Sequence, residues 1–441
     1  MSRPLRVAFF FVSFAPSVNG VVTVYRHVLE HLRKRDAALL LFVPPGSVST
    51  WPGAEVIVCP GFAIPGAAGY SVPFPPRDLD AALARFRPDV VHVVDPFGLN
   101  PLGILAIESA RRMRIPLVVG YHTHYPLYAR AYGTPFGEDL LTRMLADQCA
   151  RADLVLAPTS FIRDLLAAHG VDRVALWPGG VDIECFHPSA ASPALRERIL
   201  AHATHVTGVR PRFVVASTAR LYPEKNLAFL CRLLSGQHDF ALAVAGDGPE
   251  RAALEALLPS ATFLGNLPHR ELASLAASAD VVAVPSLTEV QGLVASEALA
   301  CGTPAVVARA GGLPEAIEQG VTGEAVEPGS AAAFLRALHR WAGAGPETAR
   351  ACRAKGTQLT WEPLLASLVD HYHDLAQRGR IDRPARRMGM GDVVPRLLGA
   401  YGTFAFRTHP IAFHAALWQP ALERWTGARR RLRARRSSHD D

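Results

Sequence analysis

The chain alternates short apolar runs, rich in β-branched residues, with longer helical patterns, and the alternation occurs in two successive series. This arrangement is typical of α/β domains with parallel sheets, whose strands are buried on both faces. In the first series we expect strands at Arg6–Phe11, Leu39–Val43, Val56–Cys59, Val90–Val94, Leu117–Gly120, Leu154–Ala157 and Val174–Leu176. The helices between them include Val21–Arg33, Leu79–Phe86 and Gly103–Arg112. In the second series we expect strands at Phe213–Ser217, Ala241–Ala245, Thr262–Leu264, Val281–Val284 and Ala305–Ala308.

A segment rich in glycine, proline and serine, Gly179–Pro193, breaks the periodicity between the two series and predicts a linker. The chain of 441 residues is also too long for one hydrophobic core of ordinary size. We therefore expect two doubly wound domains, residues 1–185 and 195–360, that face a central cleft at the carboxyl ends of their strands. Residues 361–378 are expected to form a helix that returns toward the first domain. The basic extension 379–441, rich in Pro, Gly and aromatic residues, has no role that we can assign.

The apolar run from Val7 to Ala15 is compatible with a signal peptide or with a buried first strand. We favour the strand, because no small-residue cleavage site follows and the next residues lead into an amphipathic helix. No apolar run is long enough to span a bilayer. The six cysteines are scattered without a CxxC pair, which suits free thiols in a reducing compartment better than disulfides or a zinc site.

The net charge of +7 depends strongly on an arginine-rich block at Arg424–Arg436. Such a block is compatible with a solvated tail, and it is also compatible with attraction to an anionic membrane surface or to nucleic acid.

Two candidate phosphate-binding loops follow strands of the second series. Arg220 and Lys225 flank a short loop that leads into a helix, an arrangement suited to a diphosphate, although two surface charges would look the same. Gly246 and Gly248 follow the next strand and allow a ligand to approach the backbone. They form only a partial dinucleotide-binding fingerprint, because Arg251 occupies the position of the third glycine.

A third candidate site lies in the stretch "SLTEVQGLVASEALACG", where Glu289 and Glu297 are eight residues apart. If a helix begins at Gly292 and Leu293, Glu289 lies in the preceding loop and Glu297 about one turn inside the helix. The N–H groups at the helix start would then point toward an anion, and the carboxylates would accept hydrogen bonds from hydroxyl groups of a sugar or ribose. The alternative is one loop acid and one buried helix acid without a ligand.

The first series carries two further candidates. Asn19 and Gly20 again lie between a strand and a helix start. His122 directly follows a strand end, where a histidine can bind polar groups of a ligand. His122 and His124 form an H-x-H pair, but no acidic or cysteine cluster of metal-ligand spacing accompanies them, so we expect no metal.

Taken together, these stretches resemble the family 4 nucleotide-sugar-dependent glycosyltransferases, which are retaining enzymes of the GT-B fold with two Rossmann-like domains. The resemblance extends over most of residues 5–377. Its most specific part is the E-x7-E motif formed by Glu289 and Glu297, and "ARLYPEKN", "AGDGPE" and "NGVVT" fit the same pattern.

The resemblance implies a role for each motif in the second domain. Arg220 and Lys225 would hold the donor diphosphate and stabilise the leaving nucleotide. Glu297 would bind the donor ribose. Glu289 would hold the transferred sugar together with the backbone at Gly292–Leu293.

In the first domain, the resemblance implies that Gly20 lets the loop approach the diphosphate and that His122 lines the donor sugar from the acceptor side. Three further residues, Asn19, Gly246 and Gly248, are expected to contribute to donor binding. No cofactor or metal is required if arginine and lysine supply the positive charge. Gln291 is expected to bear on the choice of donor sugar, since many members carry an aromatic residue or glycine there.

Within the family, "GYHTHYPLYARAYG" resembles GDP-mannose-dependent α-mannosyltransferases and the transferases that attach sulfoquinovose or glucose to diacylglycerol. We therefore expect a cytoplasmic hexosyltransferase that moves a mannosyl group from a nucleotide sugar to a lipid or glycan acceptor at the inner membrane face, with no nucleic-acid partner. The alternatives are a UDP-sugar-dependent diacylglycerol glycosyltransferase, a nucleotide-sugar epimerase, an NAD-dependent oxidoreductase and an inactive scaffold.

Overall fold

The computed structural model describes residues 3–17, 19–63, 71–96, 100–131 and 138–379. The arginine-rich block and nearly all of the predicted basic extension lie outside these residues.

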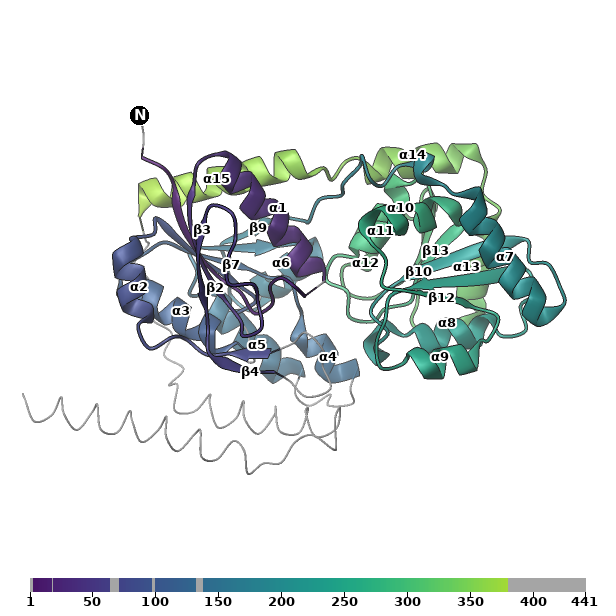
Figure 1. The fold of residues 1–441 in the computed structure, drawn as a ribbon, viewed down its shortest axis with the longest axis horizontal. Coiled ribbons are helices and arrows are strands. Elements are labelled where there is room, and N and C mark those ends of the chain that lie inside the picture. The colour runs from purple at the N-terminus through teal and green to yellow at the C-terminus, as the bar shows by residue number, and fades with distance from the viewer. Residues whose placement is uncertain (1–2, 18, 64–70, 97–99, 132–137, 380–441) are drawn as a thin grey trace, which may run out of the picture. The chain divides into compact units, whose positions relative to one another are not determined.

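The first sheet has seven parallel strands in the order β3-β2-β1-β6-β7-β8-β9 (Figure 1). Its strands are β1 (Arg6–Phe10), β2 (Ala38–Val43), β3 (Ala54–Val58), β6 (Val90–Val94), β7 (Leu117–Gly120), β8 (Leu154–Ala157) and β9 (Val174–Leu176). The apolar run near the N-terminus contains the predicted first strand, β1, which lies inside the sheet between β2 and β6. A short antiparallel pair, β4 (Gly61–Ala63) and β5 (Ser71–Pro73), was not predicted.

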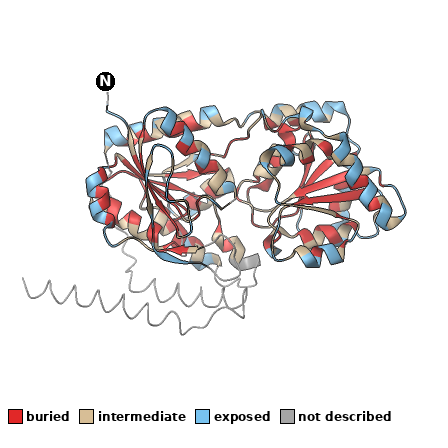
Figure 2. Cartoon of the chain, viewed as in Figure 1, coloured by how far each residue is buried: buried red, intermediate tan, exposed pale blue. Residues whose placement is uncertain are grey.

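The second sheet has six parallel strands in the order β12-β11-β10-β13-β14-β15, and the central strands of both sheets are buried (Figure 2). Its strands are β10 (Phe213–Thr218), β11 (Phe240–Ala245), β12 (Thr262–Gly265), β13 (Val281–Val284), β14 (Ala305–Ala308) and β15 (Gly323–Val326). Every predicted strand of both series is present, and the last strand, β15, is additional. The predicted α/β architecture with two parallel sheets is therefore confirmed.

Helices cover both faces of each sheet. In the first half they are α1 (Gly20–Lys34), α2 (Leu79–Phe86), α3 (Pro101–Arg112), α4 (Tyr125–Ala131), α5 (Glu138–Cys149) and α6 (Ser160–Ala168). On one face of the second sheet pack α7 (Pro193–Thr207), α10 (His269–Ser278), α11 (Leu293–Ala300) and α12 (Leu313–Ala316). On the other face pack α8 (Leu227–Leu234), α9 (Arg251–Leu257) and α13 (Ala331–Ala342), while α14 (Pro346–Gly356) packs against α11. In the part of the chain that the structure describes, 3-10 helices occur at η2 (Pro188–Ala190) and η3 (Pro223–Lys225).

Helix α15 (Trp361–Arg378) follows the second sheet in the chain but packs beside α1 in the core of the first sheet (Figure 1). Leu365, Leu368 and Tyr372 are buried there against β1 and α1. The indole Nε1–H of Trp177 also donates a hydrogen bond to the Leu364 carbonyl at 2.8 Å. Helix α15 therefore contributes side chains to the interior of the first half.

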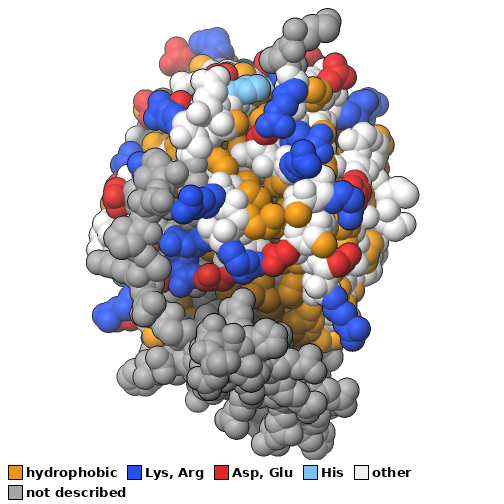
Figure 3. Space-filling model, turned by 90° about the vertical axis from the view of Figure 1, so that its left-hand side faces the viewer, with side chains coloured by type: hydrophobic (Ala, Val, Ile, Leu, Met, Phe, Trp, Pro, Cys, Tyr) orange, Lys and Arg blue, Asp and Glu red, His pale blue; other side chains and the backbone are white. Residues whose placement is uncertain are grey.

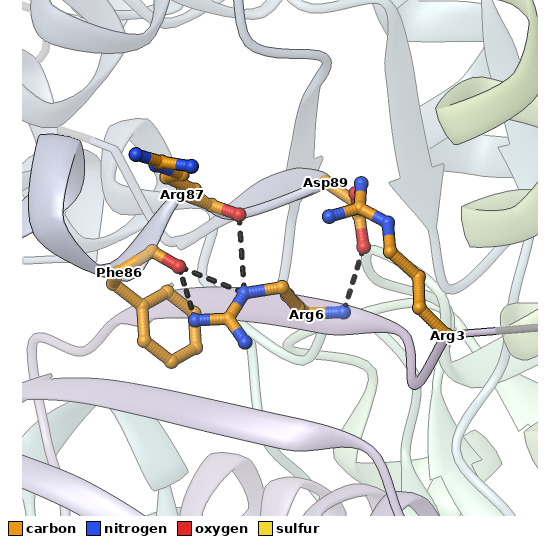
Figure 4. A network of polar contacts seen from close by, with 5 residues as sticks. All are labelled: Arg3, Arg6, Phe86, Arg87 and Asp89. Atoms are coloured by element: carbon orange, nitrogen blue, oxygen red, sulfur yellow. Dashed lines mark hydrogen bonds and ion pairs between the residues drawn. The ribbon is translucent and has the colours of Figure 1, made fainter.

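The start of β1 is fixed by a polar network around Arg6 (Figure 4). Its backbone N–H donates to the Asp89 carboxylate at 2.9 Å, and its guanidinium Nε donates to the Phe86 carbonyl at 2.8 Å. The guanidinium also lies 4.6 Å from the centre of the Phe86 ring. These contacts join the end of α2 and the start of β6 to β1.

Within the described ranges, no helix has the length and apolar character needed to cross a membrane.

Candidate functional site

Helix α11 begins as predicted, with Gly292 at the N-cap position and Leu293 as its first residue. Gly292 has a φ of 79°, and a Cβ atom there would lie 2.6 Å from Cδ2 of Leu313. Glycine is therefore required both for the left-handed backbone and for the close packing. Among the described residues, the N–H groups of Gly292 and Leu293 have no protein acceptor. An anion could be bound at this helix start.

The strongest electrostatic contact near this helix joins Lys225 and Glu289. The Lys225 ammonium, at the end of η3, lies 2.6 Å from Oε1 of Glu289 in the loop before α11. Burial by itself would raise the pKa of Glu289, but the Lys225 charge, a Ser286 hydrogen bond and the Arg220 charge bring it below its ordinary value. Burial by itself would lower the pKa of Lys225, but the negative charge of Glu289 raises the pKa above its ordinary value. Both groups are therefore charged at neutral pH.

Arg220 lies in the same electrostatic neighbourhood, since its charge acts on both Lys225 and Glu289. Its Nη2 is 3.2 Å from the buried carboxylate of Glu224, and its guanidinium is 4.8 Å from the centre of the Tyr222 ring. The structure thus brings together the two cations that the sequence singled out. Two cations beside an open helix start form a suitable site for a diphosphate.

Gly246 and Gly248 are explained by packing between two loops. A Cβ atom at Gly246 would lie 1.9 Å from the Ala219 carbonyl oxygen, and one at Gly248 would lie 2.5 Å from the Leu221 carbonyl oxygen. The loop after β11 therefore presses directly against the loop that carries Arg220. This contact requires glycine without any ligand, and the donor contact expected of these glycines stays a prediction.

Glu297 lies one turn inside α11, as predicted from its spacing to Glu289. Burial raises its pKa to about 8, and among the described residues its carboxyl group has no hydrogen bond or ion pair. The carboxyl group therefore holds a proton at neutral pH in the free protein. In that form it can both donate and accept hydrogen bonds with hydroxyl groups.

The start of α1 lies next to the start of α11. A Cβ atom at Gly20 would be 3.9 Å from Cδ1 of Leu293. The side chain of Asn19 caps α1, because its Oδ1 accepts from the Val22 N–H at 3.0 Å while its Nδ2 donates to Ser13 at 2.9 Å. The positive ends of two helix dipoles therefore lie in the same region.

Gln291 binds the backbone of Gly179 with both ends of its amide. The Gly179 N–H donates to Oε1 at 2.8 Å, and Nε2 donates to the Gly179 carbonyl at 2.9 Å. The amide thus connects the loop before α11 to the segment after β9. This contact was not predicted from the sequence, and the expected effect of Gln291 on the donor sugar stays a prediction.

His122 follows β7, and its contacts come from the first half of the chain. Its Nε2 lies 2.9 Å from the Tyr25 hydroxyl, and its backbone N–H donates to Oδ1 of Asp95 at 2.7 Å. Asp95 also accepts from the Thr123 N–H at 3.0 Å and from its hydroxyl at 2.8 Å. Burial lowers the pKa of His122 to about 4, so its ring is neutral at pH 7.

Asp95 was not recognised from the sequence. Burial raises its pKa to about 6, although the hydrogen bonds from His122 and Thr123 oppose that rise. Its φ of 48° is in the left-handed region that non-glycine residues seldom adopt. Its location directly after a fully buried strand is the one local signal that could have indicated it.

His124 is bound to the Tyr121 hydroxyl through Nδ1, so it and His122 have separate partners. Across the described ranges, no group of three or more His, Cys, Asp or Glu side chains is arranged to hold a metal ion.

Residues 18–185 match the family model described as Glycosyltransferase Family 4, and residues 208–359 match the one described as Glycosyl transferases group 1. A GDP-mannose-dependent alpha-mannosyltransferase of Corynebacterium glutamicum is 32% identical over 386 residues, which cover 85% of this chain and 90% of the relative. Sulfoquinovosyl transferase SQD2 of Arabidopsis thaliana is 33% identical over 342 residues, or 75% of this chain and 65% of the relative.

Solved structures show the same fold. Sucrose-phosphate synthase from Thermosynechococcus elongatus superposes with a TM-score of 0.65 at 20% identity, over 85% of this chain and all (100%) of that chain. Anabaena HepE in complex with UDP superposes with a TM-score of 0.62 at 20% identity, over 84% of this chain and 100% of that chain. The resemblance found in the sequence is confirmed. This chain belongs to glycosyltransferase family 4 and has the GT-B fold.

Proposed function

We propose that this glycosyltransferase moves a hexosyl group, mannosyl in particular, from a nucleoside diphosphate sugar to a hydroxyl group of a lipid or glycan, with retention at the anomeric carbon. The observation that carries this proposal is the Lys225–Glu289 ion pair beside the open start of α11. The ammonium of Lys225, the nearby charge of Arg220 and two N–H groups that have no acceptor among the described residues provide the chemistry that a diphosphate requires.

The reaction breaks the bond between the anomeric carbon and the diphosphate oxygen, and the nucleotide leaves with the bonding electrons. Arg220 and Lys225 stabilise the negative charge that develops on this oxygen. Glu289 accepts hydrogen bonds from hydroxyl groups of the sugar, and Glu297 binds the ribose. No metal is needed in this scheme, because the two cations supply the charge that a metal would otherwise supply.

Retention is explained by attack of the acceptor hydroxyl on the face from which the nucleotide leaves. This route needs no second carboxylate as a nucleophile, so the carboxylate pair of ordinary retaining glycosidases is not required. The anomeric proton coupling of the product, measured by NMR, tests this point. An inverted product would refute it.

The donor is proposed to be GDP-mannose, since three of the relatives, including that of Corynebacterium glutamicum, are GDP-mannose-dependent alpha-mannosyltransferases. The second candidate is a UDP-sugar with diacylglycerol as acceptor, because the Arabidopsis relative is a sulfoquinovosyl transferase and a relative from Streptococcus pneumoniae is an alpha-monoglucosyldiacylglycerol synthase. A thermal-shift screen against GDP-mannose, UDP-glucose, UDP-sulfoquinovose and ADP-glucose distinguishes the two. Stabilisation by UDP sugars alone would exclude the mannosyl assignment.

We further propose that transfer occurs at the cytoplasmic membrane face. Arg33, Lys34, Arg112 and Arg114 are exposed. Figure 3 shows basic side chains around apolar surface on one face of the molecule. Anionic lipid would attract such side chains, and salt would weaken the attraction. Flotation with phosphatidylglycerol vesicles at low salt, with phosphatidylcholine vesicles as the control, tests the proposal, and equal recovery from both would contradict it.

A further inference from the structure

His122 is the end of a buried chain of four hydrogen-bonded rings. Its Nε2 lies 2.9 Å from the hydroxyl of Tyr25 on α1. The same hydroxyl lies 2.8 Å from Nε2 of His92 on β6. Nδ1 of His92 lies 2.5 Å from the hydroxyl of Tyr372 on α15. The chain therefore runs from His122, through the core, to a helix that follows the second sheet in the sequence.

The inner members of this chain have no access to water. Tyr25 is 1% exposed, and both His92 and Tyr372 are 0% exposed. Burial brings the pKa values of His92 and His122 well below the usual range, so each ring is neutral and carries one proton. Each tyrosine carries one proton as well. The four groups therefore have a fixed number of donors, and every hydrogen bond needs one donor and one acceptor.

The direction of the chain follows from its buried end. Among the described residues, the Tyr372 hydroxyl has one partner, Nδ1 of His92. A buried hydroxyl proton without an acceptor is costly, so Tyr372 donates to His92. The proton of His92 is then on Nε2 and is donated to Tyr25. The Tyr25 hydroxyl in turn donates to Nε2 of His122, which leaves the His122 proton on Nδ1.

We propose that the Tyr372 hydroxyl, acting through His92 and Tyr25, holds His122 in the tautomer protonated on Nδ1. His122 is then a hydrogen-bond donor through Nδ1, an atom for which the described residues provide no partner. Tyr25, His92 and Tyr372 are positioning residues, since they act through His122. The tautomer follows from the chain alone. Its use, donation to an oxygen of the bound sugar, rests on the proposed function.

The tautomer is measured directly by NMR of the protein labelled with ¹⁵N-histidine, with His122 assigned by the loss of its signals in His122→Ala. We expect a protonated Nδ1 and an unprotonated Nε2 in the wild type. Tyr372→Phe removes the hydroxyl proton that fixes the direction of the hydrogen bonds. The ¹⁵N chemical shifts of both His122 nitrogens should then move toward the average of the two tautomers. Tyr121→Phe is the matched control, because it removes a buried hydroxyl from a different histidine, His124, and should leave the His122 signals unchanged.

Two results would overturn the proposal: a wild-type His122 protonated on Nε2, or a His122 spectrum that Tyr372→Phe does not change. If Tyr372→Phe does not fold, the wild-type spectrum still decides, and Tyr25→Phe provides a second break in the same chain.

A double-mutant cycle separates positioning from a structural role. Tyr372→Phe should lower kcat about tenfold, as expected for one lost hydrogen bond, with little change in the donor KM. In a His122→Ala background, Tyr372→Phe should have no further effect on kcat, and an equal loss in both backgrounds would contradict the coupling. A protein with the predicted tautomer but no transfer activity would instead count against the proposed function alone.

Discussion

Nζ of Lys225 lies 2.6 Å from Oε1 of Glu289, although the two residues are 64 positions apart in the chain. The lysine side chain is 11% exposed and the glutamate side chain 26%, so water screens the pair only in part. Lys225 ends the 3-10 helix η3 that follows β10, and Glu289 lies in the loop that follows β13. These two strands are neighbours near the centre of the second sheet. The parallel sheet thus brings the two charges together at the same edge.

Replacing Lys225 with methionine should disable the site. The half-buried Glu289 would lose its counter-ion, its pKa would rise, and the unfolding free energy should fall by about 2 kcal/mol. Turnover of the nucleotide sugar should fall by about 100-fold or more, because a charge that stabilises the leaving group is lost. Lys355→Met is the control, since the one hydrogen bond of the Lys355 ammonium among the described residues is an exposed contact with Gln358. Equal kcat/KM values for the two variants would contradict the role of Lys225.

Glu297 should make stability depend on pH. The folded protein keeps its proton up to about pH 8, whereas the unfolded chain releases it near 4.5. Between these values the folded state binds more protons, so the contribution of this group to stability falls as the pH rises. Glu297→Gln cannot titrate. Its unfolding free energy relative to that of the wild type should therefore rise by roughly 3–4 kcal/mol between about pH 5 and about pH 8.

Urea denaturation at several pH values measures this difference. Glu347→Gln changes a carboxylate that is 93% exposed. The difference in unfolding free energy between this variant and the wild type should not change over the same pH range. If the difference in unfolding free energy between Glu297→Gln and the wild type is also independent of pH, the Glu297 carboxyl group titrates near its ordinary value.

Gly292→Ala should destabilise the protein. The left-handed backbone and the 2.6 Å approach to Leu313 both oppose a Cβ atom, at a cost of about 1–3 kcal/mol. Gly345→Ala is the comparison, because Gly345 has a φ of −88° and nothing lies within 4 Å of its Cβ position. Chemical denaturation should therefore show a loss for the first variant and little change for the second. Similar midpoints for both would show that the loop before α11 relaxes freely.

Glu315, on α12, caps the N-terminus of α6 in the first half of the chain. Its two carboxylate oxygens accept the N–H groups of Ser160 and Phe161, each at 2.8 Å, at the start of α6. Glu315→Gln removes the negative charge and should lower the unfolding free energy by about 1 kcal/mol. Glu347→Gln again provides the control for loss of a surface carboxylate, and high salt should reduce the difference between the two. No difference at low salt would show that the cap contributes nothing.

Local periodicity was sufficient to predict most of the fold. The strands Val90–Val94 and Val281–Val284 have the predicted bounds in the structure, because short runs rich in valine favour buried strands. The start of α11 was equally predictable, since a glycine followed by a run of good helix formers marks it. Strand β15, Gly323–Val326, was missed because its four residues include a glycine and a half-buried glutamate and lack that pattern.

Contacts between distant segments could not be predicted from the sequence. Nothing near Tyr372 indicates that its hydroxyl binds His92, which is 280 residues away. The bidentate contact of Gln291 with Gly179 depends likewise on two loops that meet only in the folded chain. His92 itself was a usable signal, because a histidine in the apolar run "VVHVV" needs a buried hydrogen-bond partner.

The most direct test of the account is acceptor-dependent nucleotide release. The full-length protein is incubated with GDP-mannose or a UDP-sugar, with and without a diacylglycerol or prenyl-lipid acceptor, and both the free nucleotide and the glycosylated lipid are quantified. The account predicts that nucleotide is released in equal amount to the glycolipid formed, and only when an acceptor is present. Conversion of the donor to another nucleotide sugar without release of nucleotide would identify an epimerase instead and would contradict the central claim.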